Sequence, residues 1–335
     1  MFPEVRVYLE EVRSHLHLDQ ITEKKVISEL STYFKEKIDE LKDQGLTWAI
    51  AVKEAIKSCG RARVIGRLMY EAYSKGSWTD ALVAFLPHFI VGFLFLFHLW
   101  NNPLLLIAVY GFIMAVTLFG WWRGKPNWLY SWAGYALVPL IIGSYLAAPV
   151  LWQVVNAILA GSSDSSVWIY LAALIGFFIF ALSIMVKTTI RVVRRDWLLA
   201  SLMLIPVPIF SSWLIYTSQS GSITFITETA MYQWDAAMAS VLLTLGVTTA
   251  IFIRLRNRIL KAGAVIIIGP ISGGIIAHHF WGSIGLFGTL ATALFTLLFL
   301  ISPAILEATI GHGETKNEVW WSGDWLEHPL EMNNY

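Results

Sequence analysis

Residues 81–122 have the sequence ALVAFLPHFIVGFLFLFHLWNNPLLLIAVYGFIMAVTLFGWW, which contains no Lys, Arg, Asp or Glu. A transmembrane helix needs about 20 consecutive, mostly apolar residues. The pair Asn101-Asn102 divides this stretch into two runs of that length, 81–100 and 103–122. The stretch therefore predicts two membrane spans joined by a short polar turn.

Six further apolar runs follow the first two along the chain. They lie at residues 128–155, 167–187, 197–217, 233–253, 260–280 and 284–306. Pro206 and Pro208 interrupt the fifth of the eight runs, and Gly269-Pro270 interrupts the seventh, a feature that membranes tolerate when neighbouring groups satisfy the freed backbone. We predict an all-α chain in which a small helical domain precedes an eight-helix polytopic transmembrane bundle.

The overall composition agrees with this fold class. The chain has 335 residues, of which 56% are hydrophobic and 14% charged, against about 25% charged in a typical soluble domain. These values argue against a soluble enzyme, a disordered chain and a disulfide-stapled secreted module. The net charge of +1 provides no basic field for direct nucleic-acid binding. The single cysteine, Cys59, permits no intrachain disulfide.

Charge is distributed unevenly and predicts three parts. Residues 1–77 mix acidic and basic side chains and are expected to form a cytoplasmic helical domain, without a signal peptide because Met1–Leu30 lacks an apolar core. A small polar linker, Ser74–Ser77, leads into a transmembrane domain at 78–306. The remainder, 307–335, is an acidic tail that contains tryptophans.

The connections between the runs predict the orientation. Lys and Arg occur between runs 2 and 3, 4 and 5, and 6 and 7, whereas the alternate connections contain neither residue. Because positively charged loops stay on the cytoplasmic side, both termini are predicted to be cytoplasmic. Many of the 16 tryptophans also fall near predicted span ends, where indole rings are enriched in membrane proteins.

The N-terminal 77 residues predict a set of short amphipathic helices and resemble a known family. The resemblance lies in Tyr8–Arg13, Ile27–Leu30, Tyr33-Phe34, Glu40-Leu41, Gly45-Leu46, Ala51-Val52, Ala55-Ile56 and Gly60. This pattern, over residues 4–72, is similar to the permease prefix domain, which is related to the HAAS signalling domain. The resemblance implies a bacterial inner-membrane protein with a cytoplasmic helical prefix, in a family often associated with PadR-type transcriptional regulators. Members with an exporter-type permease carry a large extracytoplasmic domain. The longest outside connection here is about Ser218–Ala230, so no exporter role is carried over.

Ionisable residues within a membrane are candidates for function. The predicted topology brings three histidines and two carboxylates to a similar depth near the outer surface. Imidazole and carboxylate groups can bind protons or divalent metals, which predicts a metal or proton site. The alternative is a set of unrelated interfacial residues, since no HExxH or CxxC spacing supports a metal. The five residues are His98, His278, His279, Glu228 and Asp235.

A second candidate site is the interruption in the seventh run, at Gly269, Pro270, Ser272 and Gly273. Broken helices at mid-depth expose backbone groups to ions or substrates in transporters. The alternative is close helix packing through small residues.

The basic residues of the inner connections form a third group. They are predicted to contact anionic lipid head groups or to act as topology determinants. The members are Arg194, Arg195, Arg254, Arg256 and Arg258.

These features leave three hypotheses for function. The first is a signalling or regulatory membrane component whose prefix domain contacts a cytoplasmic protein partner. The second is a small-solute or ion transporter that uses the broken seventh helix, and the third is a structural subunit of a larger membrane complex. No nucleophile elbow, Walker loop or dinucleotide fingerprint is present, so we assign no catalytic residue and no cofactor.

Overall fold

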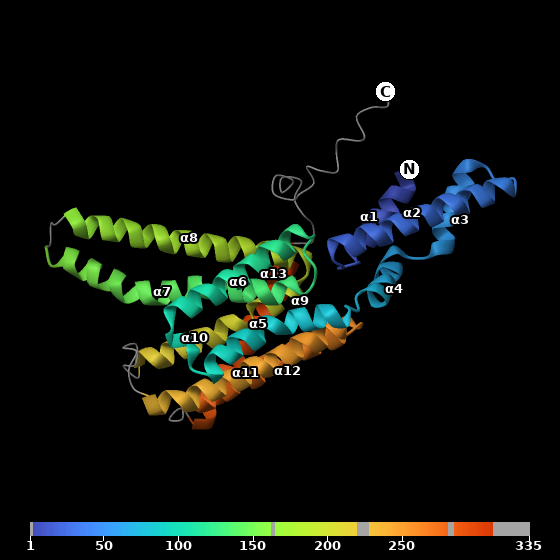
Figure 1. Ribbon diagram of the computed structural model, residues 1–335. Coiled ribbons are helices and arrows are strands. Elements are labelled where there is room, and N and C mark those ends of the chain that lie inside the picture. Colours follow the sequence, from blue (N-terminus) through green and yellow to red (C-terminus); the bar gives the residue numbers. More distant parts are fainter. Residues whose placement is uncertain (1–2, 162–164, 220–227, 281–284, 311–335) are drawn as a thin grey trace.

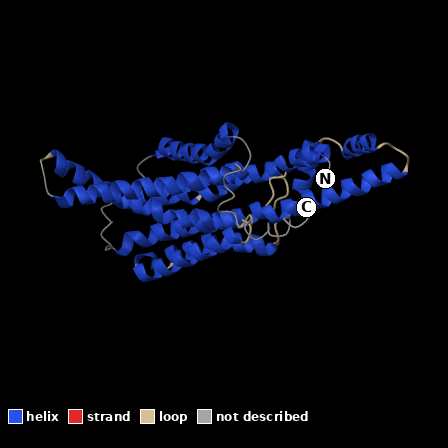
Figure 2. Cartoon of the chain, turned by 90° about the horizontal axis from the view of Figure 1, so that it is seen from above, coloured by secondary structure: helices blue, strands red, loops and turns tan. Residues whose placement is uncertain are grey.

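The computed structural model describes residues 3–161, 165–219, 228–280 and 285–310. Within these ranges the chain is helical and contains no β-strand (Figures 1 and 2). In the described part, eight helical segments are long and apolar enough to cross a membrane. The predicted fold class, an all-α polytopic bundle, is confirmed, and the chain is an integral membrane protein.

Four helices form an N-terminal helical unit: α1 (Pro3–Ser14), α2 (Gln20–Asp43), α3 (Trp48–Cys59) and α4 (Ala62–Tyr73). Their apolar faces share a buried cluster of their own, in which the rings of Tyr8 and Phe34 meet edge to face at 5.3 Å. The Tyr8 hydroxyl also donates to the Gly60 carbonyl at 3.0 Å. The unit is therefore held by its own core as well as by its attachment to the bundle.

The membrane bundle follows. Its helices are α5 (Trp78–Leu96), α6 (Pro103–Trp122), α7 (Leu129–Leu159), α8 (Ser165–Arg195), α9 (Trp197–Leu204), α10 (Pro206–Gln219), α11 (Glu228–Arg254), α12 (Arg258–Phe280) and α13 (Gly285–Ile310), with a short 3₁₀ turn, η1 (Leu99–Asn101), after α5. The fifth predicted span is divided into α9 and α10 at Pro206, as the proline there indicates.

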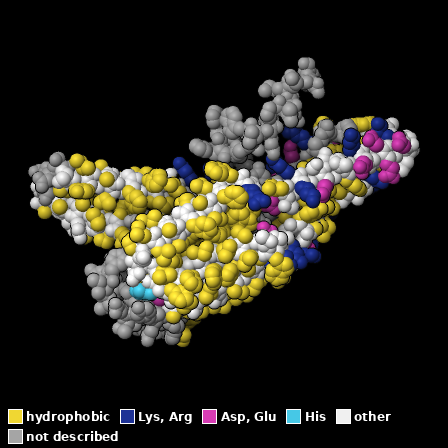
Figure 3. Space-filling model, in the orientation of Figure 1, with side chains coloured by type: hydrophobic (Ala, Val, Ile, Leu, Met, Phe, Trp, Pro, Cys, Tyr) yellow, Lys and Arg dark blue, Asp and Glu magenta, His cyan; other side chains and the backbone are white. Residues whose placement is uncertain are grey.

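The bundle has two ends, which we name from their place relative to the N-terminal helical unit. The junction end lies beside α1–α4, and the far end is opposite (Figure 1). Odd and even spans run alternately between the two ends, so the Lys and Arg of the span connections lie at the junction end. Most charged side chains on the face seen in Figure 3 gather toward α1–α4, while the bundle surface is mainly hydrophobic.

Close backbone contact occurs where α7 crosses α9. A Cβ atom on Gly134 would lie 2.2 Å from the backbone oxygen of Met203, so only glycine fits this crossing. Around it, Trp132, Tyr135, Leu198 and Met203 are almost completely buried. A closely packed part of the bundle core thus lies near the junction end, between α7 and α9.

Three predicted boundaries differ from the structure. The first span ends at Leu96, before His98, whose backbone is left-handed with φ 55° and begins the turn into α6. Helix α8 continues to Arg195, so Arg194 and Arg195 belong to a helix and not to a loop. Helix α13 continues to Ile310, so the predicted tail begins inside a helix. Hydropathy marks where apolar residues stop, whereas α8 and α13 continue through polar residues that have partners at the junction. Helix α5 instead ends within its apolar run, where the chain turns toward α6.

Candidate functional site

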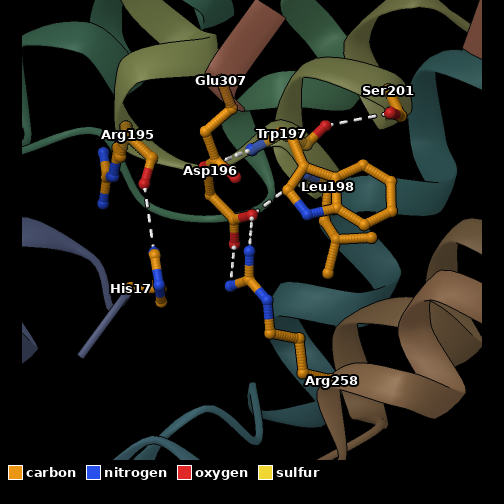
Figure 4. A network of polar contacts seen from close by, with 8 residues as sticks. All are labelled: His17, Arg195, Asp196, Trp197, Leu198, Ser201, Arg258 and Glu307. Atoms are coloured by element: carbon orange, nitrogen blue, oxygen red, sulfur yellow. Dashed lines mark hydrogen bonds and ion pairs between the residues drawn. The ribbon is translucent and has the colours of Figure 1, made fainter. Parts of the chain in front are cut away.

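The junction end holds a network of buried polar contacts between the N-terminal helical unit and the bundle (Figure 4). The Arg195 guanidinium, at the end of α8, donates through Nη2 to the Leu18 carbonyl at 3.2 Å. Through Nη1 it donates to the Lys125 carbonyl at 3.0 Å and to the Tyr130 hydroxyl at 2.8 Å. One side chain therefore joins the α1–α2 connection, the α6–α7 connection and the start of α7. His17 lies beside the Arg195 carbonyl, with Nδ1 at 3.5 Å.

The centre of the network is an ion pair between Asp196 and Arg258. Arg258 Nη2 lies 2.8 Å from Asp196 Oδ1, and Nη1 lies 3.2 Å from Oδ2, a bidentate arrangement. The Asp196 side chain is 4% exposed, and Arg258 is the cation that pairs with it. The pair connects the turn between α8 and α9 with the start of α12.

Two carboxylates meet the N-terminus of α9. Asp196 is its N-cap residue and accepts from the Leu198 backbone N–H at 3.0 Å. Glu307, from α13, accepts from the Trp197 N–H at 3.3 Å. Helix N-termini favour negative charge because their first N–H groups lack partners within the helix. The N-terminus of α9 is thus contacted by Asp196, which pairs with Arg258 of α12, and by Glu307 of α13.

The linker after α4 is bound to the turn between α11 and α12. The Ser74 hydroxyl donates to the Arg256 carbonyl at 2.9 Å, and the Gly76 N–H donates to the Ile253 carbonyl at 3.0 Å. The Arg254 guanidinium donates to the Gly76 carbonyl at 2.9 Å. These contacts make the linker a fixed connection along its length.

Tyr70 brings α4 itself into the network. The Arg258 guanidinium and the Lys261 ammonium lie 5.9 Å and 5.2 Å from the centre of its ring. Burial of the hydroxyl, with the nearby negative charge of Asp196, raises the pKa of Tyr70 well above its usual range. The Tyr70 side chain is therefore neutral at physiological pH, and its ring makes cation–π contacts with both cations.

The five arginines of the inner connections have different surroundings. Arg195, Arg254 and Arg258 bind groups of the protein, Arg194 is half-buried, and Arg256 has an exposed side chain. Contacts with lipid head groups stay a prediction for this set. The structure adds an intramolecular role for three of its members.

At the far end the structure brings together two of the five residues predicted to share a site. His98 Nδ1 is hydrogen-bonded to Asp235 Oδ2, and Trp100 Nε1 donates to both carboxylate oxygens at 2.9 and 3.0 Å. The Asp235 side chain is 4% exposed. The side chains of Glu228, His278 and His279 lie outside the described residues. Among the residues that are described, no group of three His, Cys, Asp or Glu is arranged to hold a metal.

A third histidine is buried in the middle of the bundle. His88 of α5 lies with Nδ1 2.8 Å from the Tyr135 hydroxyl and with Nε2 3.1 Å from the Thr249 hydroxyl. Both ring nitrogens thus have partners on neighbouring helices, α7 and α11. This arrangement connects three helices in a region where water is scarce.

Helix α12 is continuous through Gly269 and Pro270, in contrast to the interruption predicted there. A Cβ atom on Gly269 would lie 2.2 Å from Leu300 Cδ1, and one on Gly273 would lie 2.5 Å from Thr296 Oγ1. Both neighbours belong to α13, so these glycines allow α12 and α13 to approach closely. Ser272 is buried beside them. A role for this segment in transport stays a prediction.

Three residues of this network, Asp196, Glu307 and Tyr70, are not among the candidates that the sequence predicts. Asp196 offered a signal, because an aspartate just before an apolar run is a typical N-cap. Glu307 follows the last predicted apolar run, which ends at residue 306, so the sequence places it in the acidic tail. Nothing in the local sequence of Tyr70 indicates that Arg258 and Lys261, 188 and 191 residues later, lie over its ring.

Comparison of the full chain with family models, with curated proteins and with solved structures finds no match.

Proposed function

We propose that this integral membrane protein is a signalling or regulatory component of a bacterial inner membrane. In this proposal the N-terminal helical unit is cytoplasmic and contacts a protein partner, while the bundle responds to the state of the membrane. The resemblance of residues 4–72 to the permease prefix domain gives the proposal its first support. It agrees with the basic residues of the junction end, which favour a cytoplasmic location for that end.

The observation that carries the proposal is the way the unit is attached. Three separate parts of the unit and its linker, at Leu18, Tyr70 and Ser74–Gly76, are bound by residues from α8, α11 and α12. A unit that served only as a flexible appendage would need no such contacts. Because several spans contact the unit, a change in their relative positions alters its surroundings directly.

The test is to uncouple the unit from the bundle and to measure partner capture by the full-length chain. Arg258→Gln removes the ion pair with Asp196 and one of the two cations over Tyr70. Arg256→Gln is the matched control, because Arg256 lies two residues earlier and its side chain is exposed. Quantitative affinity purification from bacterial membranes then compares both variants with the unmodified protein.

A second readout follows the attachment itself. Spin labels at Glu36 in α2 and Leu104 in α6, both exposed, report the distance between the unit and the bundle after Cys59→Ser. We expect Arg258→Gln to broaden this distance distribution and to change partner capture at least threefold, while Arg256→Gln changes neither. Equal capture by all three proteins, or purification without any protein partner, would overturn the proposal.

A further inference from the structure

A groove runs along the bundle where α5, α6 and α7 meet at the junction end. Its volume is about 570 Å³, within the range of roughly 300–1,000 Å³ found for ligand sites. Its walls are apolar side chains from the three helices, among them Val83, Phe112, Val116, Phe119, Trp128 and Trp132. A groove of this kind in a membrane span is suited to a hydrocarbon chain.

The apolar walls are held in place by specific contacts. Trp132 Nε1 donates to the Val83 carbonyl at 2.8 Å, which satisfies its polar atom, and its buried ring supports the wall from behind Phe112 at 5.8 Å. Gly120 lets Trp128 lie against α6, since a Cβ atom there would be 2.8 Å from Trp128 Cη2. Phe112 and Phe119 are each 53% exposed, so this wall borders the surrounding lipid. The groove is thus preformed and accessible from the bilayer.

Two opposite charges line the junction end of the same groove. Asp80 lies in the first turn of α5, and Arg123 caps the end of α6. Asp80 Oδ2 accepts from both the backbone N–H and the hydroxyl of Ser77, which fixes the carboxylate at the helix start. The Arg123 guanidinium lies 5.7 Å from the Phe119 ring, and no ion pair joins it to a carboxylate among the described residues. The polar end therefore offers one anion and one cation, whereas the remainder is apolar.

We propose that this groove binds one zwitterionic glycerophospholipid, with an acyl chain along Phe112 and Val116 and its head group between Arg123 and Asp80. The lipid phosphate is complementary to Arg123, and a head-group ammonium is complementary to Asp80. An anionic lipid would satisfy only the first of these charges. The combination of a buried apolar body and a polar end at the interface matches the two parts of such a lipid.

The groove also includes a residue of the N-terminal helical unit. Ile21, at the start of α2, lines it and lies close to Gly124, whose Cβ position is 3.1 Å from Ile21 Cγ1. A lipid in the groove therefore touches α2 as well as the bundle. This contact would make the lipid the membrane signal that the unit receives, a step that rests on the proposed function.

The binding test is native mass spectrometry of the full-length protein titrated with phosphatidylethanolamine or phosphatidylglycerol. Val116→Trp fills the groove, and Ile107→Trp is the control because Ile107 is 70% exposed elsewhere on α6. We expect one retained phosphatidylethanolamine, at least fivefold less retention in Val116→Trp, and no change in Ile107→Trp. Equal retention by both tryptophan variants would overturn the site.

Two milder variants test the head-group assignment without altering the apolar walls. Arg123→Gln is expected to weaken retention of both lipids at least threefold. Asp80→Asn is expected to abolish the preference for phosphatidylethanolamine. A preference for phosphatidylglycerol in the unmodified protein, unaffected by Asp80→Asn, would overturn the zwitterionic assignment.

The label pair at Glu36 and Leu104 separates this inference from the proposed function. A lipid-dependent change in their distance supports both. Normal lipid retention without any change in distance supports the binding site and contradicts the signalling link. Native mass spectrometry measures lipid retention independently of partner capture. The lipid site and the proposed function are therefore contradicted by different measurements.

Discussion

The two ends of the bundle differ in what holds their helices together. At the junction end, charged and polar side chains such as Arg195, Asp196 and Arg258 bind groups from distant parts of the chain. At the far end, the described polar contacts centre on His98, Trp100 and Asp235. The outer halves of α7 and α8 project away from α10 and α11 there (Figure 1), with exposed apolar residues such as Ile169 and Ile179.

This difference indicates where the bundle is rigid. Hydrogen bonds and ion pairs specify direction and distance, whereas apolar contacts with lipid and with neighbouring helices specify neither. The junction end is therefore expected to keep one arrangement, and the far ends of α7 and α8 are expected to move more freely in the bilayer.

The largest expected effect comes from Arg258→Ala. Removing one partner of a buried ion pair leaves an uncompensated charge and costs about 3–5 kcal/mol. We expect this loss in the free energy of unfolding in detergent, because Asp196 would remain buried without its cation. Arg256→Ala, which changes an exposed side chain in the same turn, should stay within about 0.5 kcal/mol of the unmodified protein. Similar losses for both variants would contradict the role of the pair.

A smaller effect is expected from Gly134→Ala. The new methyl group would collide with the Met203 backbone oxygen, which is not free to rotate away. Overpacking of this kind costs about 1–3 kcal/mol, measurable as a lower midpoint of thermal unfolding. Gly176→Ala on α8 is the matched control, because no atom lies within 4 Å of its Cβ position. If Gly176→Ala were the more harmful change, the assignment of tight and open regions would be reversed.

The smallest effect is expected at the far end. Asp235→Asn keeps an acceptor for Trp100 but removes the charge opposite His98, so we expect a loss of about 1 kcal/mol. Asn101→Ala, an exposed neighbour, should leave stability unchanged. A loss as large as that of Arg258→Ala would show that the far end is held as firmly as the junction end.

Much of the fold follows from local sequence. Hydropathy located the eight spans, and Pro206 predicted the division of the fifth span, because both signals act within about 20 residues. The sequence predicts the ends of α5, α8 and α13 less accurately. Helix α8 continues past its apolar run because Arg195 finds acceptors at Leu18 and Lys125. The sequence does not reveal such acceptors before the fold is known.

The candidate site was less predictable than the fold for the same reason. Asp196 and Arg258 are 62 residues apart, and Ser74 and Lys261 are 187 residues apart. Charge patterning placed the basic residues on one side of the membrane, but it does not pair a particular arginine with a particular acid. At the far end, topology gave similar depths for His98 and Asp235, and the left-handed turn at His98 is what brings the ring to the carboxylate.

The length of α8 has a consequence for how the protein responds to the thickness of the bilayer. Its 31 residues correspond to about 46 Å at the usual rise per residue, whereas the hydrocarbon core is about 30 Å thick. The excess is the charged end that begins at Lys187, and the apolar residues 167–186 span about 30 Å. An apolar stretch that exceeds the local thickness responds by tilting. Arg195 at the end of α8 binds the Leu18 carbonyl. Thinning of the bilayer would therefore increase the tilt of α8 and displace the connection between α1 and α2.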